Sequence, residues 1–185
     1  MDGIPTLIRT ETASNSSSVA FVHGTSSVVF DSTYIHYTFV MTDIGPATDN
    51  VSFQMQVSTD AGSNYTALNV TSTAFSAGHG EDDSGGSLGY SPADDLAEST
   101  SAITLVSAAG NDADQSIAGT LHIFNPSSAT FSTAFYGRFN SSHTSDHVQD
   151  VFPAGYVNST GDVDAVRFIM SSGNFDGVIQ LYGIA

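Results

Sequence analysis

Strict alternation of apolar and polar side chains is the feature that most constrains this chain. Residues 51–57 read Val-Ser-Phe-Gln-Met-Gln-Val, so every second side chain is apolar. In an extended strand, residues i and i+2 point to the same face. The pattern therefore predicts a strand with one face in the core and the other toward solvent.

Other apolar runs follow along the chain, and residues that favour turns separate them. The strongest runs are residues 33–41, 117–124, 131–139, 163–170 and 178–184, and weaker ones are residues 19–23, 28–30, 65–75, 103–106 and 152–157. Gly, Asn, Asp, Ser and Pro cluster between them and supply the positive or fixed φ angles of turns. About ten short strands, separated by such turn residues, predict an all-β fold, an antiparallel β-sandwich of jelly-roll type.

One short helix is expected at residues 91–98, Ser-Pro-Ala-Asp-Asp-Leu-Ala-Glu. Serine suits the N-cap, proline suits the first turn, and acidic side chains favour the positive end of the helix dipole. The helix would close the long irregular segment 77–95. Segments of this length within a compact domain are usually functional or mobile.

The chain of 185 residues is expected to hold one domain, at residues 19–185. Residues 1–18 are expected to form an extended N-terminal arm. Its apolar side chains Ile4, Leu7 and Ile8 would anchor on a neighbouring subunit, and its Ser/Asn stretch would act as a flexible link. A frayed terminus is the alternative.

The charge balance excludes several classes of partner. There are nineteen acidic residues, three arginines and no lysine, which gives a formal net charge of -16. Nucleic acids and anionic membranes need a basic patch, which three scattered arginines cannot make. The absence of cysteine excludes disulfides, a thiol nucleophile and cysteine-based metal sites.

Catalytic motifs have weak support, so no enzyme activity is expected. Residues 85–89 read Gly-Gly-Ser-Leu-Gly, which fits G-x-S-x-G, but that serine needs a sharp strand-to-helix turn. The residues before it form an acidic loop rather than an apolar strand. No pair of carboxylates stands out for glycoside hydrolysis either.

Two polar segments are candidates for ligand binding. The candidate residues are Glu81, Asp82, Asp83 and Tyr90 in one segment, and His143, Asp146 and His147 in the other. Exposed His, Thr and Asp side chains can read a glycan, although a plain surface loop is the alternative. The two histidines would share a metal only on a helix, which the flanking strands disfavour. No cofactor is expected, with Ca²⁺ on the acidic loops as the open alternative.

Three segments carry distinctive strand and turn motifs. They are residues 30–53, with Phe-Asp-Ser-Thr-Tyr and later Thr-Asp-Ile-Gly-Pro; residues 119–128, Gly-Thr-Leu-His-Ile-Phe-Asn-Pro-Ser-Ser; and residues 168–184, ending in Leu-Tyr-Gly-Ile. Together these segments resemble a group of virion structural proteins from marine tailed bacteriophages. The order and spacing of these motifs cover residues 19–184. They consist of strands and turns and contain no catalytic residue.

The resemblance implies a non-enzymatic structural protein on the virion surface, made in the cytoplasm of the host bacterium. An outward-facing capsid decoration or cement module is expected. It would act through multivalent packing as a homo-oligomer, and a trimer is the expected state. The major capsid protein would be its partner. The alternative is a tail-fibre domain that uses the polar loops to recognise a host surface glycan.

Overall fold

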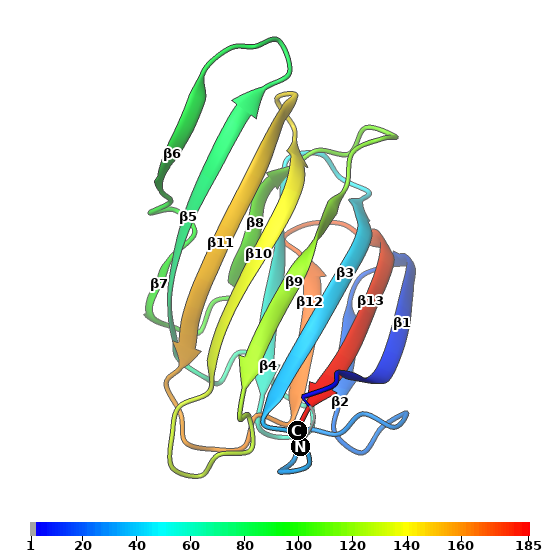
Figure 1. Cartoon of the computed structure of the whole chain (residues 1–185), viewed down its shortest axis with the longest axis vertical. Coiled ribbons are helices and arrows are strands. Elements are labelled where there is room, and N and C mark those ends of the chain that lie inside the picture. Colours follow the sequence, from blue (N-terminus) through cyan, green and yellow to red (C-terminus); the bar gives the residue numbers. More distant parts are fainter. Residues whose placement is uncertain (1–2) are drawn as a thin grey trace.

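The computed structural model describes residues 3–185 as thirteen strands without a helix (Figure 1). All strand pairs are antiparallel. The strands are β1 (Thr6–Ser16), β2 (Val19–Val22), β3 (His36–Pro46), β4 (Val51–Ser58), β5 (Val70–Gly80), β6 (Gly86–Tyr90), β7 (Leu96–Ser99), β8 (Ile103–Ala109), β9 (Ile117–Phe124), β10 (Ala134–His143), β11 (His147–Val157), β12 (Ala165–Met170) and β13 (Phe175–Ile184).

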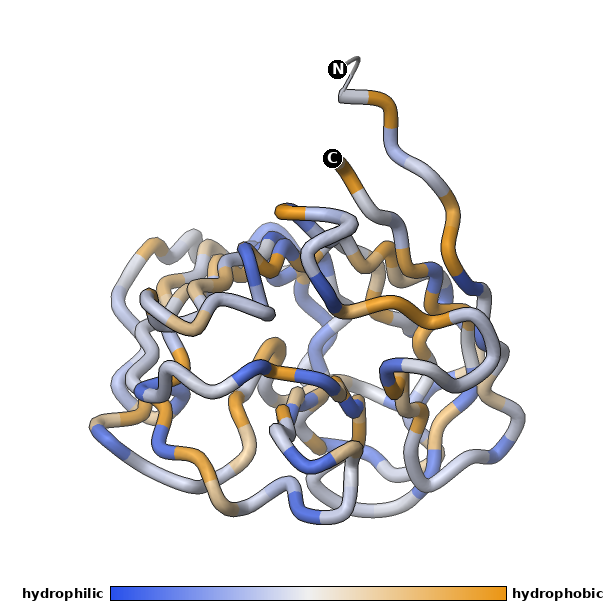
Figure 2. Tube along the Cα trace, turned by 90° about the horizontal axis from the view of Figure 1, so that it is seen from below, coloured by the Kyte–Doolittle hydropathy of each residue, from blue (hydrophilic) through white to orange (hydrophobic). Residues whose placement is uncertain are grey.

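Eight of these strands have the connectivity of a jelly roll. One set of neighbours is β1-β13-β3-β9, and the other is β2-β12-β4-β8. The chain crosses from one set to the other at β1–β2, β2–β3, β3–β4, β8–β9 and β12–β13. The two sets form the two layers that are visible from below in Figure 2. The predicted antiparallel sandwich of jelly-roll type is confirmed.

The remaining five strands widen one layer. β10 pairs with β9, β11 with β10, and β5 with β11, while β6 and β7 both pair with the far edge of β5. We call this wide layer the front sheet and the four strands β8-β4-β12-β2 the back sheet. A single pair, His143 with Ala109, joins β10 to β8 across the layers.

The core lies between the two sheets and is rich in aromatic rings. Val51, Phe53, Met55 and Val57 are all buried, as the alternation predicts. Phe168 of β12 is fully buried at the centre. Its ring centroid lies 5.1 Å from that of Phe39, 5.8 Å from that of Phe53 and 6.4 Å from that of Phe21. Rings from both sheets therefore interlock around one side chain.

The helix predicted at residues 91–98 is wrong. Residues 92–94 form a turn, in which the Asp94 amide donates to the Ser91 carbonyl at 3.1 Å. Leu96 then pairs with Ser72 as β7 begins. The edge of β5 offers the backbone hydrogen-bond partners along this segment, and these outweigh a weak local preference for helix.

The extended N-terminal arm is also wrong for most of its length. Residues 6–16 form β1, which pairs with β13, so the domain begins well before residue 19. Ile8 is partly buried and packs against the core of its own chain. Ile4 and Leu7 are exposed, and their contact with another subunit stays a prediction. Residues 1 and 2 of the predicted arm lie outside the described residues.

Tyr37 gives the fold an expected sensitivity to alkali. Burial raises the pKa of its hydroxyl to about 12, whereas a tyrosine in an unfolded chain has a pKa of about 10. Between these values the unfolded chain loses the proton and the folded chain keeps it. Stability should therefore fall by about 1.4 kcal/mol per pH unit as the pH rises from about 10 to 12. Urea unfolding across this range measures the loss.

Tyr37→Phe is the control, because it removes the titrating group and keeps the ring. The chain has no lysine and no cysteine, so the other tyrosines are the main side chains that titrate in the same range. The slope of stability against pH should be shallower in the variant. An unchanged slope would contradict the assignment to Tyr37.

Candidate functional site

Large apolar side chains cover the outer face of the front sheet. The register places them on neighbouring strands, with Tyr90, Phe75 and Phe152 directly opposite one another. We call the whole set the aromatic band: Leu88, Tyr90, Phe75, Phe152, Tyr156, Tyr136, His122, Phe124, His36, Tyr182, Ile184 and Leu7. It runs from β6 at one edge of the front sheet to β1 at the other.

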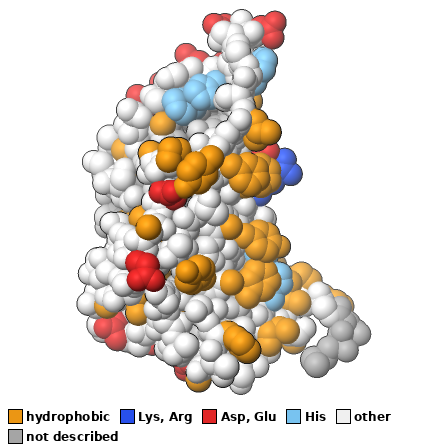
Figure 3. All heavy atoms as spheres, turned by 90° about the vertical axis from the view of Figure 1, so that its left-hand side faces the viewer, with side chains coloured by type: hydrophobic (Ala, Val, Ile, Leu, Met, Phe, Trp, Pro, Cys, Tyr) orange, Lys and Arg blue, Asp and Glu red, His pale blue; other side chains and the backbone are white. Residues whose placement is uncertain are grey.

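Half of the aromatic band is exposed, and the other half is half-buried, although most of its members are apolar. Six of the ten exposed large hydrophobic side chains of residues 3–185 belong to it, and Leu88 is the most exposed of all at 76%. In Figure 3 hydrophobic side chains gather along the side of the molecule that corresponds to the front sheet. A contiguous apolar patch of this kind is typical of an interaction surface.

The back sheet has a different outer face. Gln54, Gln56 and Arg167 point outward there, and none of the ten exposed hydrophobic side chains lies on its strands. The Arg167 guanidinium donates to the Gln56 side chain at 2.6 Å and lies 4.1 Å from the ring centroid of Tyr65. The loop that carries Tyr65 thus packs on this face, and the exposed apolar surface is confined to the front of the sandwich.

Rings within the aromatic band stack on one another across the strands. Phe75 and Phe152 are almost parallel, with an interplanar angle of 3° and centroids 4.7 Å apart. The Arg138 guanidinium lies 5.1 Å from the Phe152 centroid and forms an ion pair with Asp150 at 2.8 Å. The charges of this pair cancel, whereas Asp95, which accepts from the Tyr90 hydroxyl, places a negative charge at the β6 edge of the band.

Two histidines lie side by side in the same surface. The Nε2 atom of His36 is 2.8 Å from the Nδ1 atom of His122, and the Thr38 hydroxyl lies within hydrogen-bond reach of both. Burial lowers the pKa of His36. Burial and then the neighbouring His36 charge lower the pKa of His122. Both rings are therefore held neutral, with one nitrogen donating and the other accepting.

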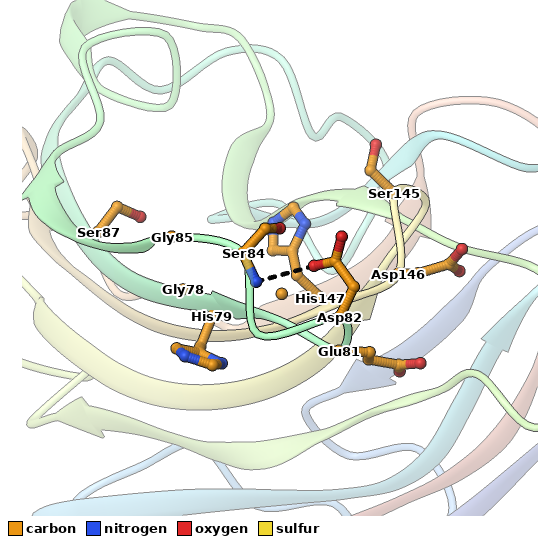
Figure 4. Close-up of a pocket in the computed structure, with 11 residues that line it drawn as sticks. Gly78, His79, Glu81, Asp82, Ser84, Gly85, Ser87, Ser145, Asp146 and His147 are labelled. Atoms are coloured by element: carbon orange, nitrogen blue, oxygen red, sulfur yellow. Dashed lines mark hydrogen bonds between the residues drawn. The ribbon is translucent and has the colours of Figure 1, made fainter.

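The two polar segments predicted as ligand loops do meet in space. The amide of Glu81 donates to the carbonyl of Asp146 at 3.0 Å, which ties the β5–β6 turn to the β10–β11 turn. Together they line a hollow of about 590 Å³ at one end of the molecule (Figure 4). The lining residues are Gly78, His79, Gly80, Glu81, Asp82, Ser84, Gly85, Ser87, Ser145, Asp146 and His147.

The predicted loop residues are not all part of this hollow. Asp83 extends toward His79, 3.6 Å away. Tyr90 points to the outer face of the front sheet and donates to Asp95, so it belongs to the aromatic band. His143 stacks on His147, with ring centroids 3.9 Å apart, because the two residues are paired across the β10–β11 hairpin. Burial and then His147 lower the pKa of His143.

The hollow is lined by carboxylate, imidazole and hydroxyl groups. Asp82 accepts from the Ser84 amide at 2.9 Å. In Figure 4 the His79 and His147 rings lie on opposite sides of β5. Among residues 3–185, no group of three or more His, Asp or Glu side chains is placed to hold a metal ion. Binding of Ca²⁺ by the acidic loops stays a prediction.

The sequence predicts most aromatic residues on strands, Tyr136 among them, as core residues and leaves the remainder for a subunit interface, but it does not predict the aromatic band. The runs that carry Tyr136 and Phe152 are apolar at successive positions, a pattern that favours a strand buried on both faces. A signal was present in residues 134–140, where Tyr136, Arg138 and Asn140 share one face. A strand that mixes an aromatic ring with polar side chains on one face is typical of a surface, not of a core.

Comparison of the chain with protein-family models, with curated proteins and with solved structures finds no match. No helix of residues 3–185 has the length and apolar character needed to cross a membrane. The geometry of the aromatic band and of the polar hollow therefore provides the basis for a functional proposal.

Proposed function

We propose that this protein is a non-enzymatic structural protein of a bacteriophage virion. It would face outward on the particle as a capsid decoration or cement module. The motif resemblance over residues 19–184 supports this proposal. The jelly-roll connectivity, with turns rich in small polar residues, is also consistent with a surface module of a particle. Assembly in the bacterial cytoplasm would need no cysteines, and the chain has none.

The aromatic band is the observation that carries the proposal. Its apolar area is exposed on one face, and such an area is stabilised when another protein surface covers it. In an assembly of many symmetric copies, even a modest buried area per copy adds up to a stable structure. The acidic remainder of the surface suits a position away from packaged DNA, because like charges repel.

Binding to particles that lack the protein tests this function. Purified protein should co-sediment with such particles and saturate at a fixed number of copies per particle. Gold-labelled antibody should then mark the heads in electron micrographs. Absence of saturable binding to particles would contradict the proposal.

The polar hollow favours the second candidate, a tail-fibre domain that recognises a host surface glycan. Asp82, Asp146 and His147 come together there from two separate segments, and carboxylate and imidazole groups can bond sugar hydroxyls. Label over the tail instead of the heads, together with saturable binding to host envelope polysaccharide, would favour this candidate.

A further inference from the structure

The geometry points to a second copy of this chain as the partner that covers the aromatic band. The band is then a self-association interface, in which the front sheets of two copies pack face to face. This inference rests on the proposed packing function and names the partner for one surface. Face-to-face sheets bury their side chains in a layer about 10 Å thick, as the two sheets of one sandwich do.

Charge is the first argument for a second copy. The chain carries a net charge of -16, so two copies that met through acidic surfaces would repel each other. The centre of the aromatic band reduces this repulsion, because Arg138 and Asp150 neutralise each other there at 2.8 Å, and the acidic Asp95 contacts the band only at its β6 edge. A basic partner would instead be drawn to the acidic surfaces and would gain nothing from this face.

Size is the second argument. The aromatic band crosses eight adjacent strands, β6-β5-β11-β10-β9-β3-β13-β1. At about 4.8 Å between strands it is roughly 34 Å wide, and its rows of outward residues span about 14 to 20 Å along the strands. The rectangle that encloses the aromatic band, which also holds Thr38, Ala154 and Arg138, has a flat area on the order of 600 Å², whereas a standard interface buries ~800 Å² per partner.

The ring geometry disfavours a polysaccharide on this face. Phe75 and Phe152 stack on each other, and Phe124 stacks on His36 at 4.7 Å and on Tyr136 at 5.6 Å. The faces of these five rings are thus directed at other rings, and their edges are left for a partner. Leu88, Leu7 and Ile184 are the aliphatic members of the band, and they add apolar contact but no hydrogen bond for a sugar. Protein side chains can pack against such edges and aliphatic groups.

The experiment measures the mass of the purified full chain in solution without particles. Sedimentation equilibrium over about a hundredfold range of concentration should show twice the monomer mass at the upper end of the range. Tyr136→Asp places a carboxylate at the centre of the band, and Phe75→Asp places one nearer its edge. Each should weaken self-association by at least about 100-fold, since an unpaired charge would be buried at the interface.

Gln54→Asp is the matched control, because it adds the same charge on the outer face of the back sheet. It should leave the association unchanged, and circular dichroism should show that all three variants fold. A monomeric wild type, or an association that survives Tyr136→Asp in a folded protein, would overturn the inference. So would a monomer whose band binds host polysaccharide or another virion protein.

The two proposals can fail separately. A monomeric protein that still saturates particles would overturn the self-association and leave the virion function standing. An oligomer that is lost in Tyr136→Asp but never binds particles would support the self-association and contradict the virion function.

Discussion

Phe168→Ala is expected to lower the free energy of unfolding by about 4 kcal/mol, one of the largest effects of any single substitution in this chain. The Phe168 ring is fully buried and contacts rings from both sheets. Its removal takes away the burial of the ring and leaves a cavity that Phe39 and Phe53 cannot fill without leaving their own contacts. Urea unfolding followed by tyrosine fluorescence measures the loss.

Phe131→Ala is the control for this prediction. Phe131 is 71% exposed in the β9–β10 connection, so the same truncation should change stability by less than about 0.5 kcal/mol. A loss of similar size at both positions would mean that the two sheets do not pack around Phe168. Because a whole domain is stabilised by only about 5 to 15 kcal/mol, Phe168→Ala should also lower the yield of folded protein.

Gly177→Ala is expected to cost at least about 2 kcal/mol through the backbone alone. Gly177 has a φ of 134°, which L side chains rarely adopt. A Cβ atom there would lie 2.7 Å from the Asp43 carbonyl oxygen and 2.7 Å from the Ile44 side chain. The glycine sits where the registers of β13 with β1 and with β3 both shift, so neither neighbour is free to move aside.

Gly45→Ala offers a matched control on the neighbouring strand. Gly45 lies opposite Asp176 in the same sheet, its φ is not in the left-handed region, and a Cβ there meets no atom within 4 Å. The substitution should be close to neutral by thermal unfolding. Equal losses at Gly45 and Gly177 would contradict the proposed role of the backbone conformation.

The sequence predicts a strand well where one face is buried and the other faces solvent, because apolar and polar side chains then alternate. Residues 51–57 alternate without a break, and the structure buries the apolar set. β6 was not predicted, because Gly86–Tyr90 is exposed along its whole length and carries two glycines. Pairing with β5 holds it as a strand, which is a tertiary effect that no local pattern records.

The same limit explains the helix at residues 91–98 and the arm at residues 1–18. Each segment has a local preference for its predicted state, yet each lies beside a strand edge that offers hydrogen bonds. Residues 6–16 pair with the edge of β13 as β1, and β7 pairs with the edge of β5. For the candidate site, the sequence predicted four of the residues that line the polar hollow, Glu81, Asp82, Asp146 and His147, but not that the two segments meet there.

The central place of β12 and β13 has a consequence for biosynthesis. β13 lies between β1 and β3, and β12 lies between β2 and β4. Neither sheet can form completely during synthesis until residues 165–184 have left the ribosome. These residues supply β12, which joins β2 to β4, and β13, which joins β1 to β3. A chain dominated by such distant pairings folds slowly. The high negative charge of the chain would make incomplete nascent chains repel one another, which would limit aggregation until β13 has been synthesised.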